Sequence, residues 1–425
     1  MKLLLLVLCS TVYVTSFCQT GWTWTELDSM PERVANNAVA YGTDDVYDYV
    51  FSFGGIDSTK IHTGVNKRAY RYTVGTDSWE EIAPLPFTLS NIASGASTVK
   101  NRIYIIGGYH VNPGGSEVSS NEVIRYNPET NSYLTNGATI PTPIDDHVQC
   151  VWKDSLIYVV TGWSNTGNVP NVQIYDAELD TWLTGTETPN TNEYKAFGAS
   201  GEIIGDTIYY YGGASTGINF PAQKLLRKGV INAENPTEIE WTLLEDGPTT
   251  LYRSAALTYG DYIFWAGGSA ISYNYNGVAY NGSGGVPPLN QIMRYDHTNG
   301  NWNQGEGASF GVMDLRGIAQ ISPTEWIICG GMEAEQYVSR KTYLLTYDPV
   351  VGSVKKDHSN SRIKIVDNVI IYSGNANKME IADLSGKIIA ELDPNSPIIP
   401  EIQGCFILLV HENNDIATFK IVRLQ

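Results

Sequence analysis

The sequence predicts an all-β protein: six four-stranded sheets arranged radially as the blades of a β-propeller, followed by a small C-terminal β-sandwich. The composition is the first observation. The 425 residues include 27 tyrosines, 10 tryptophans and 41 glycines but only 6 methionines, which suits many short strands joined by tight turns. The second is an aromatic or aliphatic run ending in Gly-Gly that recurs with spacings of 51 to 63 residues. The third is a change of pattern after about Lys356.

The charge balance excludes some classes of partner. Lys plus Arg is 27 and Asp plus Glu is 45, which gives a net charge of −18. Such a field repels phosphate backbones, so we expect no nucleic-acid partner. With 42% hydrophobic residues, the chain is also too apolar to be disordered.

The N-terminus has the order of a secretory signal peptide, predicted over residues 1–18. A lysine precedes an apolar stretch over residues 3–8, and small side chains at Ser16 and Cys18 fit cleavage after residue 18. A membrane anchor is disfavoured because the apolar core is too short, and a lipoprotein box because Phe17 is too bulky at its position. No other segment approaches the length of a transmembrane helix. Cleavage would leave a net charge of −18 − 1 = −19.

Three cysteines would remain after cleavage: Cys150, Cys329 and Cys405. They are scattered and form no CxxC pair, so we expect neither a disulfide framework nor a zinc site. Cys150 and Cys329 lie in apolar, strand-like runs, where a buried and inert thiol is usual.

The recurrent run is the strongest signal of architecture. After each doublet a loop leads to a second strand that ends in a Tyr-centred turn, and a Trp or Tyr opens the next strand. One four-stranded unit cannot bury both of its faces unless several pack radially. The first glycine lies at Gly54, Gly107, Gly212, Gly267 and Gly330, and Thr161 takes its place in a sixth copy. This pattern resembles the kelch repeat over roughly residues 21–350, and the resemblance implies a β-propeller.

The ends of the repeat predict how the ring closes. The sixth unit stops at YDPVVGSVKKD without a Trp strand, whereas the mature N-terminus begins with a Trp strand, WTWTEL, that no Gly-Gly precedes. We expect this first strand to complete the last blade and leave no open edge, so that the propeller spans residues 19–355. Blade four departs from the pattern: KLLRKGVINAENPTEIEW lacks the Tyr-Asp turn, and the repeat does not define its outer strands.

Residues 356–425 form a separate predicted domain, a small Ig-like β-sandwich. RIKIVDNVIIYSG, KMEIADLSGKIIAEL and CFILLVHENNDIATFKIVRLQ have the alternation of strands. DLSGK and the basic closing strand FKIVRLQ resemble the C-terminal sorting domain of type IX secretion in Bacteroidetes, although IYSGNANK stands where that family has a Pro-Asn-Pro turn. The resemblance implies that the type IX secretion machinery exports the protein to the cell surface or beyond. An ordinary accessory sandwich, such as a carbohydrate-binding module, is the alternative.

The loops that lead into the first strand of each blade, here called the inner loops, supply a candidate site. Because strand direction alternates, they should share one face with the loops that follow each Gly-Gly. A mostly cationic ring at the channel mouth of an acidic protein predicts a site for an anionic or hydroxyl-rich ligand. The inner loops carry Arg33, Asn91, Asp146, His147, Tyr194, Lys195, Arg253 and Arg316. For a single arginine the alternative is structural, a guanidinium that braces neighbouring loop carbonyls.

The longest loop after a Gly-Gly, SAISYNYNGVAYNGSGGVPPLN, is a second candidate. Tyr273, Tyr275, Asn276, Tyr280 and Asn281 alternate flat apolar faces with amide and hydroxyl groups. This is the chemistry that stacks on sugar rings and hydrogen-bonds their hydroxyls, and surface loops often carry binding sites. The alternative is a rim loop that packs its own tyrosines over blade five.

Catalytic signals are sparse. The six histidines show no HExxH and no paired metal spacing, and no GxSxG elbow is present, so we expect neither a metal nor a cofactor. Some bacterial kelch propellers are sialic acid mutarotases. Such an isomerase would need an arginine for the substrate carboxylate, Arg253 or Arg316, beside an acid/base, for which His147 and Glu193 are the candidates. Galactose oxidase also has a kelch domain, but its copper site needs a Tyr–Cys cross-link and two histidines that have no counterpart here.

These observations favour a secreted or surface-displayed kelch propeller that binds a glycan or another extracellular ligand on the face of the inner loops and the post-Gly-Gly loops. A carbohydrate epimerase of the sialic acid mutarotase type is the first alternative, and a protein–protein interaction platform is the second. A deep pocket in which an arginine meets an acid/base would favour the enzyme. An open face lined with tyrosines would favour binding.

Overall fold

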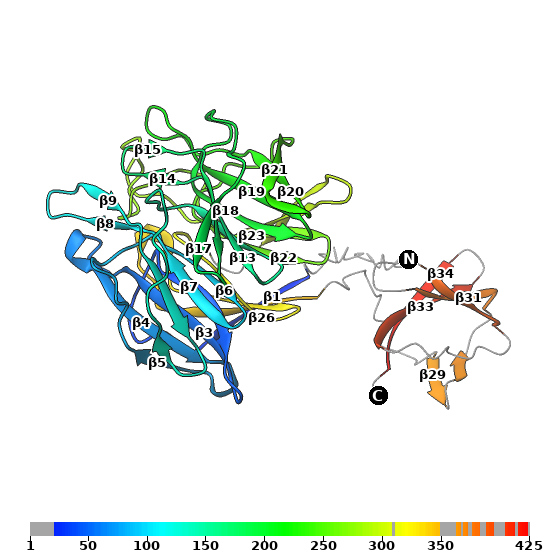
Figure 1. The fold of residues 1–425 in the computed structure, drawn as a ribbon. Helices are drawn as coiled ribbons and strands as arrows, with labels where there is room; N and C mark the ends of the chain where they lie inside the picture. The colour runs from blue at the N-terminus through cyan, green and yellow to red at the C-terminus, as the bar shows by residue number, and fades with distance from the viewer. Residues whose placement is uncertain are drawn as a thin grey trace, which may run out of the picture. The chain divides into compact units, whose positions relative to one another are not determined.

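A computed structural model describes residues 21–307, 311–348, 363–366, 369–372, 376–382, 388–394, 404–412 and 415–423. The predicted signal peptide, residues 1–18, lies outside the described residues. The chain divides into two compact units, Trp22–Tyr347 and a second unit that holds the strands described after Asp348 (Figure 1).

The described part of the first unit forms six four-stranded antiparallel sheets. Sheets one to three contain, in order, β2 (Ala38–Thr43), β3 (Asp48–Ile56), β4 (Val65–Thr73) and β5 (Ser78–Ile82); β6 (Gly95–Val99), β7 (Arg102–Ile106), β10 (Val123–Asn127) and β11 (Ser132–Tyr133); and β12 (Val148–Trp152), β13 (Leu156–Val160), β16 (Val172–Asp176) and β17 (Thr181–Thr184).

Sheets four to six follow the same plan. They contain β18 (Phe197–Ile204), β19 (Thr207–Ala214), β20 (Leu226–Asn232) and β21 (Asn235–Leu243); β22 (Ala255–Tyr259), β23 (Tyr262–Ala266), β24 (Gln291–Asp296) and β25 (Trp302–Gly307); and β26 (Ala319–Ser322), β27 (Glu325–Cys329), β28 (Thr342–Tyr347) and β1 (Trp22–Leu27). In sheet four, whose outer strands the repeat did not define, β20 and β21 pair with a register shift between Ile231 and Asn232.

Short elements decorate the loops that follow the Gly-Gly pairs and the ends of some strands. They are the hairpins β8 (Tyr109–Val111) with β9 (Glu117–Ser119) and β14 (Trp163–Ser164) with β15 (Gly167–Asn168), and the 3-10 turns η1 (His62–Gly64), η2 (Val74–Thr76) and η3 (Ala334–Gln336).

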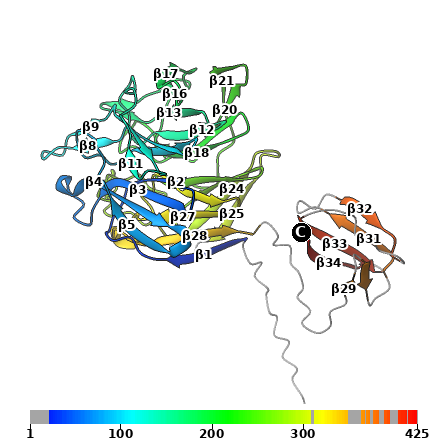
Figure 2. The same cartoon turned by 60° about the horizontal axis from the view of Figure 1, so that its bottom comes forward.

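The first strand of the chain lies in the last sheet. β1 pairs antiparallel with β28, from Trp22 opposite Tyr347 to Leu27 opposite Thr342, and Figure 2 shows the two strands side by side. The pairing covers the outer edge of β28, which would otherwise offer free backbone groups to another chain.

Buried apolar clusters between neighbouring sheets account for the radial arrangement. In the described first unit, six such clusters join sheet one to two, two to three, three to four, four to five, five to six, and six back to one. Tyr126 of sheet two, for example, packs edge-on against Phe51 of sheet one at 5.1 Å between ring centroids. Because the last cluster returns to the first sheet, the ring is closed.

The Gly-Gly pairs end the second strand of each sheet in a left-handed conformation. Gly107 and Gly108 have φ of 66° and 88°, and a Cβ on Gly107 would lie 2.3 Å from the carbonyl oxygen of Ile144. A side chain at position 107 would therefore clash with this carbonyl, and the torsion itself favours glycine. Thr161 takes the same place in sheet three with φ 48°, and its hydroxyl donates to the carbonyl of Val169 at 2.9 Å.

The second unit is also built from strands. Its described residues form a hairpin of β29 (Ile363–Val366) with β30 (Val369–Tyr372), and an antiparallel sheet in the order β32 (Ile388–Leu392), β31 (Lys378–Ala382), β33 (Gly404–Glu412) and β34 (Asp415–Arg423). Met379, Ile381, Leu408 and Val410 are buried in this sheet. The division between the units falls at Tyr347, a few residues before the predicted boundary at 355.

Replacing Trp22 with Ala should destabilise the propeller by about 3–5 kcal/mol, because it removes a buried aromatic contact that ties β1 into the ring. Trp22 is 6% exposed, and its ring lies 5.1 Å from Phe264 and 5.7 Å from Trp326. Chemical denaturation of the full chain, followed by circular dichroism, measures the change. Thr25→Ala, at an exposed position of the same strand, is the control. Equal and small losses for the two variants would show that β1 does not hold the ring closed.

Candidate functional site

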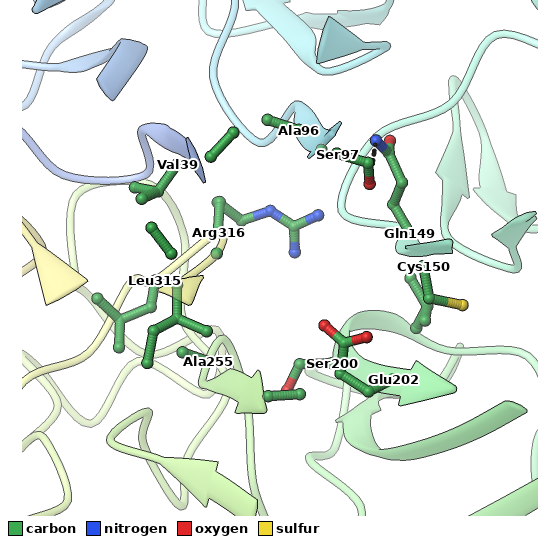
Figure 3. Close-up of a pocket in the computed structure, with 18 of the residues that line it drawn as sticks. Val39, Ala96, Ser97, Gln149, Cys150, Ser200, Glu202, Ala255, Leu315 and Arg316 are labelled. Atoms are coloured by element: carbon green, nitrogen blue, oxygen red, sulfur yellow. Dashed lines mark hydrogen bonds between the residues drawn. The ribbon is translucent and has the colours of Figure 1, made fainter. Parts of the chain in front are cut away.

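The first strands of the six sheets surround a channel in the first unit. It is lined by residues of β2, β6, β12, β18, β22 and β26 and of the inner loops before them, and it encloses about 350 Å³. Ligand sites commonly occupy about 300–1,000 Å³, so the channel has room for one small molecule. Figure 3 shows Arg316, from the inner loop before β26, and Glu202, from β18, pointing into it.

A ring of backbone hydrogen bonds between inner loops closes one end of this channel. In each bond a backbone N–H of one loop donates to a backbone carbonyl of another. The donor and acceptor residues are Ala93 and Asn36 (3.4 Å), Asp146 and Ala93 (3.2 Å), Gly198 and Asp146 (2.8 Å), Arg253 and Gly198 (2.8 Å), Leu315 and Arg253 (3.1 Å), and Asn36 and Asp314 (3.0 Å). Asn36, Ala93, Asp146, Gly198, Arg253 and Asp314 all have a left-handed φ between 47° and 67°. The shared conformation turns each loop toward its neighbour, and we call this set the loop ring.

A buried ion cluster lies within the loop ring. Arg253 donates to both carboxylate oxygens of Asp146, at 3.0 and 2.5 Å, and to Asp314 at 3.0 Å. Arg253 and Asp146 are each 1% exposed and Asp314 is 0% exposed. Arg253 therefore has its charge satisfied inside the protein, and a ligand carboxylate cannot reach it in this structure. The bracing role is the one that the geometry supports, contrary to the expectation that Arg253 binds a ligand.

Apolar side chains of the inner loops and the post-Gly-Gly loops pack together as a loop cap. Tyr252 and Tyr273 belong to it, and their ring centroids lie 5.2 and 5.6 Å from the guanidinium carbon of Arg253. Its other fully buried members are Ala35, Ile56, Val65, Ile92, Ala93, Tyr109, Val111, Phe197, Ala214, Ala279, Val286, Met313, Met332 and Val338. The cap and the ion cluster together exclude solvent from this end of the channel.

The channel opens at the opposite end. His147, Ser254 and Leu315, where the lining begins beside the loop ring, are 1–3% exposed. Tyr41, Val151 and Glu202, further along the strands, are half-buried and Gln320 is exposed. Access therefore comes from the hairpins that join the first and second strands of each sheet, which is the face opposite to the one predicted.

Arg316 is the cation at the closed end of the channel. Its Nη2 donates to the carbonyl of His147 at 2.8 Å, and its Nη1 lies 3.5 Å from Asp146. The Nε is buried and has no hydrogen-bond partner in the structure. Asp146 already accepts two bonds from Arg253, so Arg316 has only a shared counterion and retains capacity for an anion.

Glu202 is a carboxyl group on β18 that the sequence analysis did not single out. It lines the channel, and none of the described cations forms an ion pair with it. Burial raises the pKa of Glu202 to about 7, although a backbone hydrogen bond from Ile203 acts in the opposite direction. Loss of hydration disfavours the ionised form of a carboxyl. The sequence feature that could have identified Glu202 is an acidic residue inside the apolar strand FGASGEII.

Neutral polar groups complete the wall. Gln149 donates to the hydroxyl of Ser97 at 3.0 Å (Figure 3), and the hydroxyls of Ser200 and Ser254 lie 2.6 Å apart. His147 lines the channel, and its Nε2 lies 3.0 Å from the Gln149 side-chain oxygen. Burial lowers the pKa of His147 to about 4, so this imidazole is neutral at physiological pH.

The other predicted site residues do not line the channel. Arg33 donates to the carbonyl of Val338 at 3.1 Å and lies 4.2 Å from the Tyr337 ring. Asn91 is buried and its amide nitrogen lies 3.4 Å from the carbonyl of Gly107. Glu193 is exposed and Lys195 is half-buried, and neither is brought together with His147 in the channel.

The tyrosine loop also packs largely inward. Tyr273 is 0% exposed, and Tyr280 lies 5.0 Å from Phe220 between ring centroids. Tyr275 and Asn276 are half-buried, and the Asn276 side-chain oxygen accepts a bond from the N–H of Val278 at 3.0 Å. The structure thus favours the rim-loop alternative over an open sugar-stacking platform.

Among the described residues, no group of three or more His, Cys, Asp or Glu is placed to hold a metal ion. In the same part of the chain, no helix is long and apolar enough to cross a membrane. Cys150 and Cys329 are buried as free thiols.

Comparison with known proteins agrees with this architecture. The kelch motif matches residues 93–133, which cover the inner loop and strands of sheet two. A solved structure described as "Structure of YjhT" superimposes with a TM-score of 0.61 and 18% identity, covering 76% of this chain and 97% of that one. The chain thus contains a kelch motif and has a fold similar to that of this solved structure. At 18% identity, the structural likeness concerns the fold alone.

Curated relatives are kelch proteins from eukaryotes. Kelch-like protein terF of Aspergillus terreus is 27% identical over 183 residues, which are 41% of this chain and 38% of that protein. Kelch-like protein 36 of Bos taurus is 22% identical over 194 residues, 46% of this chain and 29% of that protein. Kelch domain-containing protein 10 of Homo sapiens is 26% identical over 153 residues, 33% of this chain and 32% of that protein. The chain thus spans about a third of the length of each relative.

Replacing Arg253 with Met should reduce the free energy of unfolding by about 3–5 kcal/mol, because it leaves the buried Asp314 without its counterion and Asp146 with only the more distant Arg316. Arg33→Met is the matched control, since Arg33 makes a single carbonyl hydrogen bond and a ring contact on the loops and should lose about 1 kcal/mol. Urea denaturation of the full chain measures both. If Arg253→Met leaves stability unchanged, the ion cluster is not the brace that holds the inner loops together.

Proposed function

We propose that this kelch-repeat protein binds a small acidic, hydroxyl-rich ligand, such as an acidic sugar, in its central channel. The observation that carries the proposal is Arg316, whose guanidinium points into a cavity of about 350 Å³ and whose counterion Asp146 is shared with Arg253. A carboxylate is the natural partner of a buried guanidinium. Ser97, Gln149 and Ser200 line the same cavity and offer hydrogen bonds to hydroxyl groups.

Glu202 gives the proposed site a pH dependence. Below about pH 7 its carboxyl is protonated and can donate a hydrogen bond, whereas above about pH 7 it ionises and repels a ligand carboxylate. The affinity for an acidic ligand should therefore fall as the pH rises through neutrality.

Arg316→Gln should weaken binding of N-acetylneuraminic or glucuronic acid roughly tenfold to a hundredfold, which corresponds to the loss of a charged hydrogen bond worth about 1.5–3 kcal/mol. Isothermal titration calorimetry between pH 6 and 8 (roughly one unit either side of neutrality) measures the affinity, and Glu202→Gln should remove most of its pH dependence. Arg33→Gln is the control, because Arg33 lies outside the channel lining. The proposal fails if Arg33→Gln weakens binding and Arg316→Gln does not.

A second candidate function is isomerisation of an acidic sugar, as in the sialic acid mutarotases. It is favoured by Glu202, since a carboxyl that titrates near neutral pH is suited to transfer a proton in both directions. Arg316 would hold the substrate carboxylate in that reaction. NMR exchange between the anomers of N-acetylneuraminic acid distinguishes the two functions: a binding protein leaves the exchange rate unchanged, whereas a mutarotase accelerates it and loses this acceleration in Glu202→Gln.

A protein-interaction role is the third candidate and is favoured by exposed apolar loop residues such as Ile218, at 90% exposed.

The proposed location is outside the cell or on its surface. It is supported by the signal-peptide pattern of residues 1–18 and by the resemblance of residues 356–425 to a type IX sorting domain. Deleting residues 356–425 should leave the propeller folded and retain it in the periplasm of a Bacteroidetes host that has this secretion system. Cell fractionation and surface proteolysis, compared with the full chain, measure the outcome. Normal surface delivery of the truncated protein would rule out the sorting role.

A further inference from the structure

We infer that the channel is blind, that is, closed at the end where the inner loops lie. It therefore accepts the acidic end residue of a ligand chain and excludes an acidic residue in the interior of a chain. This inference rests on the proposed binding of an acidic ligand in the channel and specifies which form of that ligand fits. It depends on three features of the channel: one end is closed, the other end is open, and Arg316 lies next to the closed end.

The closed end is sealed in three ways. The loop ring joins all six inner loops through backbone hydrogen bonds of 2.8–3.4 Å. Arg253, Asp146 and Asp314, at 0–1% exposed, fill the space inside that ring. The loop cap then packs against this cluster through Tyr252 and Tyr273. A polymer therefore has no path out of the channel on the loop side.

Arg316 lies next to that seal. It is the residue that follows Leu315, a member of the loop ring, and it bonds to the carbonyl of His147 beside Asp146. A ligand carboxylate that pairs with Arg316 must therefore reach the floor of the channel. An acidic residue with sugars attached on both sides would need one neighbour to occupy the space taken by the ion cluster.

The open end and the volume agree with this geometry. Gln320 is exposed at the end of the lining where the hairpins lie, and a chain attached to the bound residue can leave there. A volume of about 350 Å³ is near the lower limit for small-molecule sites, which is consistent with one residue at the floor rather than several.

Thiol labelling tests the direction of access without any ligand. Ser200 lies on the channel wall and is half-buried, so Ser200→Cys should react with a small methanethiosulfonate reagent, with the wild-type chain as the blank for native cysteines. Adding Gln320→Trp at the open end should slow the reaction at least tenfold. Adding Ile218→Trp on the loop face is the control and should leave the rate unchanged. The inference is overturned if Gln320→Trp has no effect or if Ile218→Trp has the larger one.

Oligosaccharide binding tests the preference for chain ends. The probes are glucuronic acid, a hyaluronan tetrasaccharide with glucuronic acid at its non-reducing end, and the same oligosaccharide capped by N-acetylglucosamine. We expect calorimetry to detect the first two and to show at least tenfold weaker binding of the third. Equal binding of the capped and uncapped chains would overturn the inference. If neither glucuronic acid nor N-acetylneuraminic acid binds, the proposed function fails, while the labelling rates still decide whether the channel is blind.

Discussion

The circle of backbone hydrogen bonds among the inner loops is the constraint on which the rest of this structure depends. Its six positions share a left-handed φ, yet only Gly198 among them is a glycine. Holding Ala93 or Arg253 in this conformation costs roughly 1–2 kcal/mol per residue, and the strain persists because each inner loop donates a backbone N–H to a carbonyl of a neighbouring loop. The ring brings Asp146, Arg253 and Asp314, from three different inner loops, close enough to form the buried ion cluster.

The ion cluster in turn determines which of the two arginines, Arg253 or Arg316, can bind a ligand. Arg253 donates hydrogen bonds of 2.5–3.0 Å to two carboxylates, Asp146 and Asp314, whereas Arg316 has only the shared Asp146, at 3.5 Å. Two residues with the same charge, on neighbouring loops, therefore differ in role because one has a complete set of partners and the other does not. A ligand carboxylate at Arg316 would complete the second set. The site consequently lies inside the channel, and the loop face carries the seal.

The sequence predicted the architecture well because the repeat is a local signal. The Gly-Gly pairs, the Tyr turns and the Trp strands each recur at matching offsets, and the unpaired strand at residues 22–27 pointed to the edge of the last sheet, where β1 pairs with β28. The site was less accessible to sequence reasoning. Arg253 and Arg316 look alike in the sequence, and their difference arises only when Asp146 and Asp314 are folded against them. Glu202 was missed because a single acidic residue in a strand carries no motif, and its environment comes from five other sheets.

Amide hydrogen exchange at the loop ring tests most directly whether the inner loops seal the channel. If they do, the amides of Ala93, Asp146, Gly198 and Arg253 exchange only when the whole propeller opens, as slowly as the amides of the buried strands β7 and β13. Exchange of these four amides at the rate of the exposed loops would mean that the ring opens independently. In that case the loop face, and not the opposite end, would be the entrance to the channel.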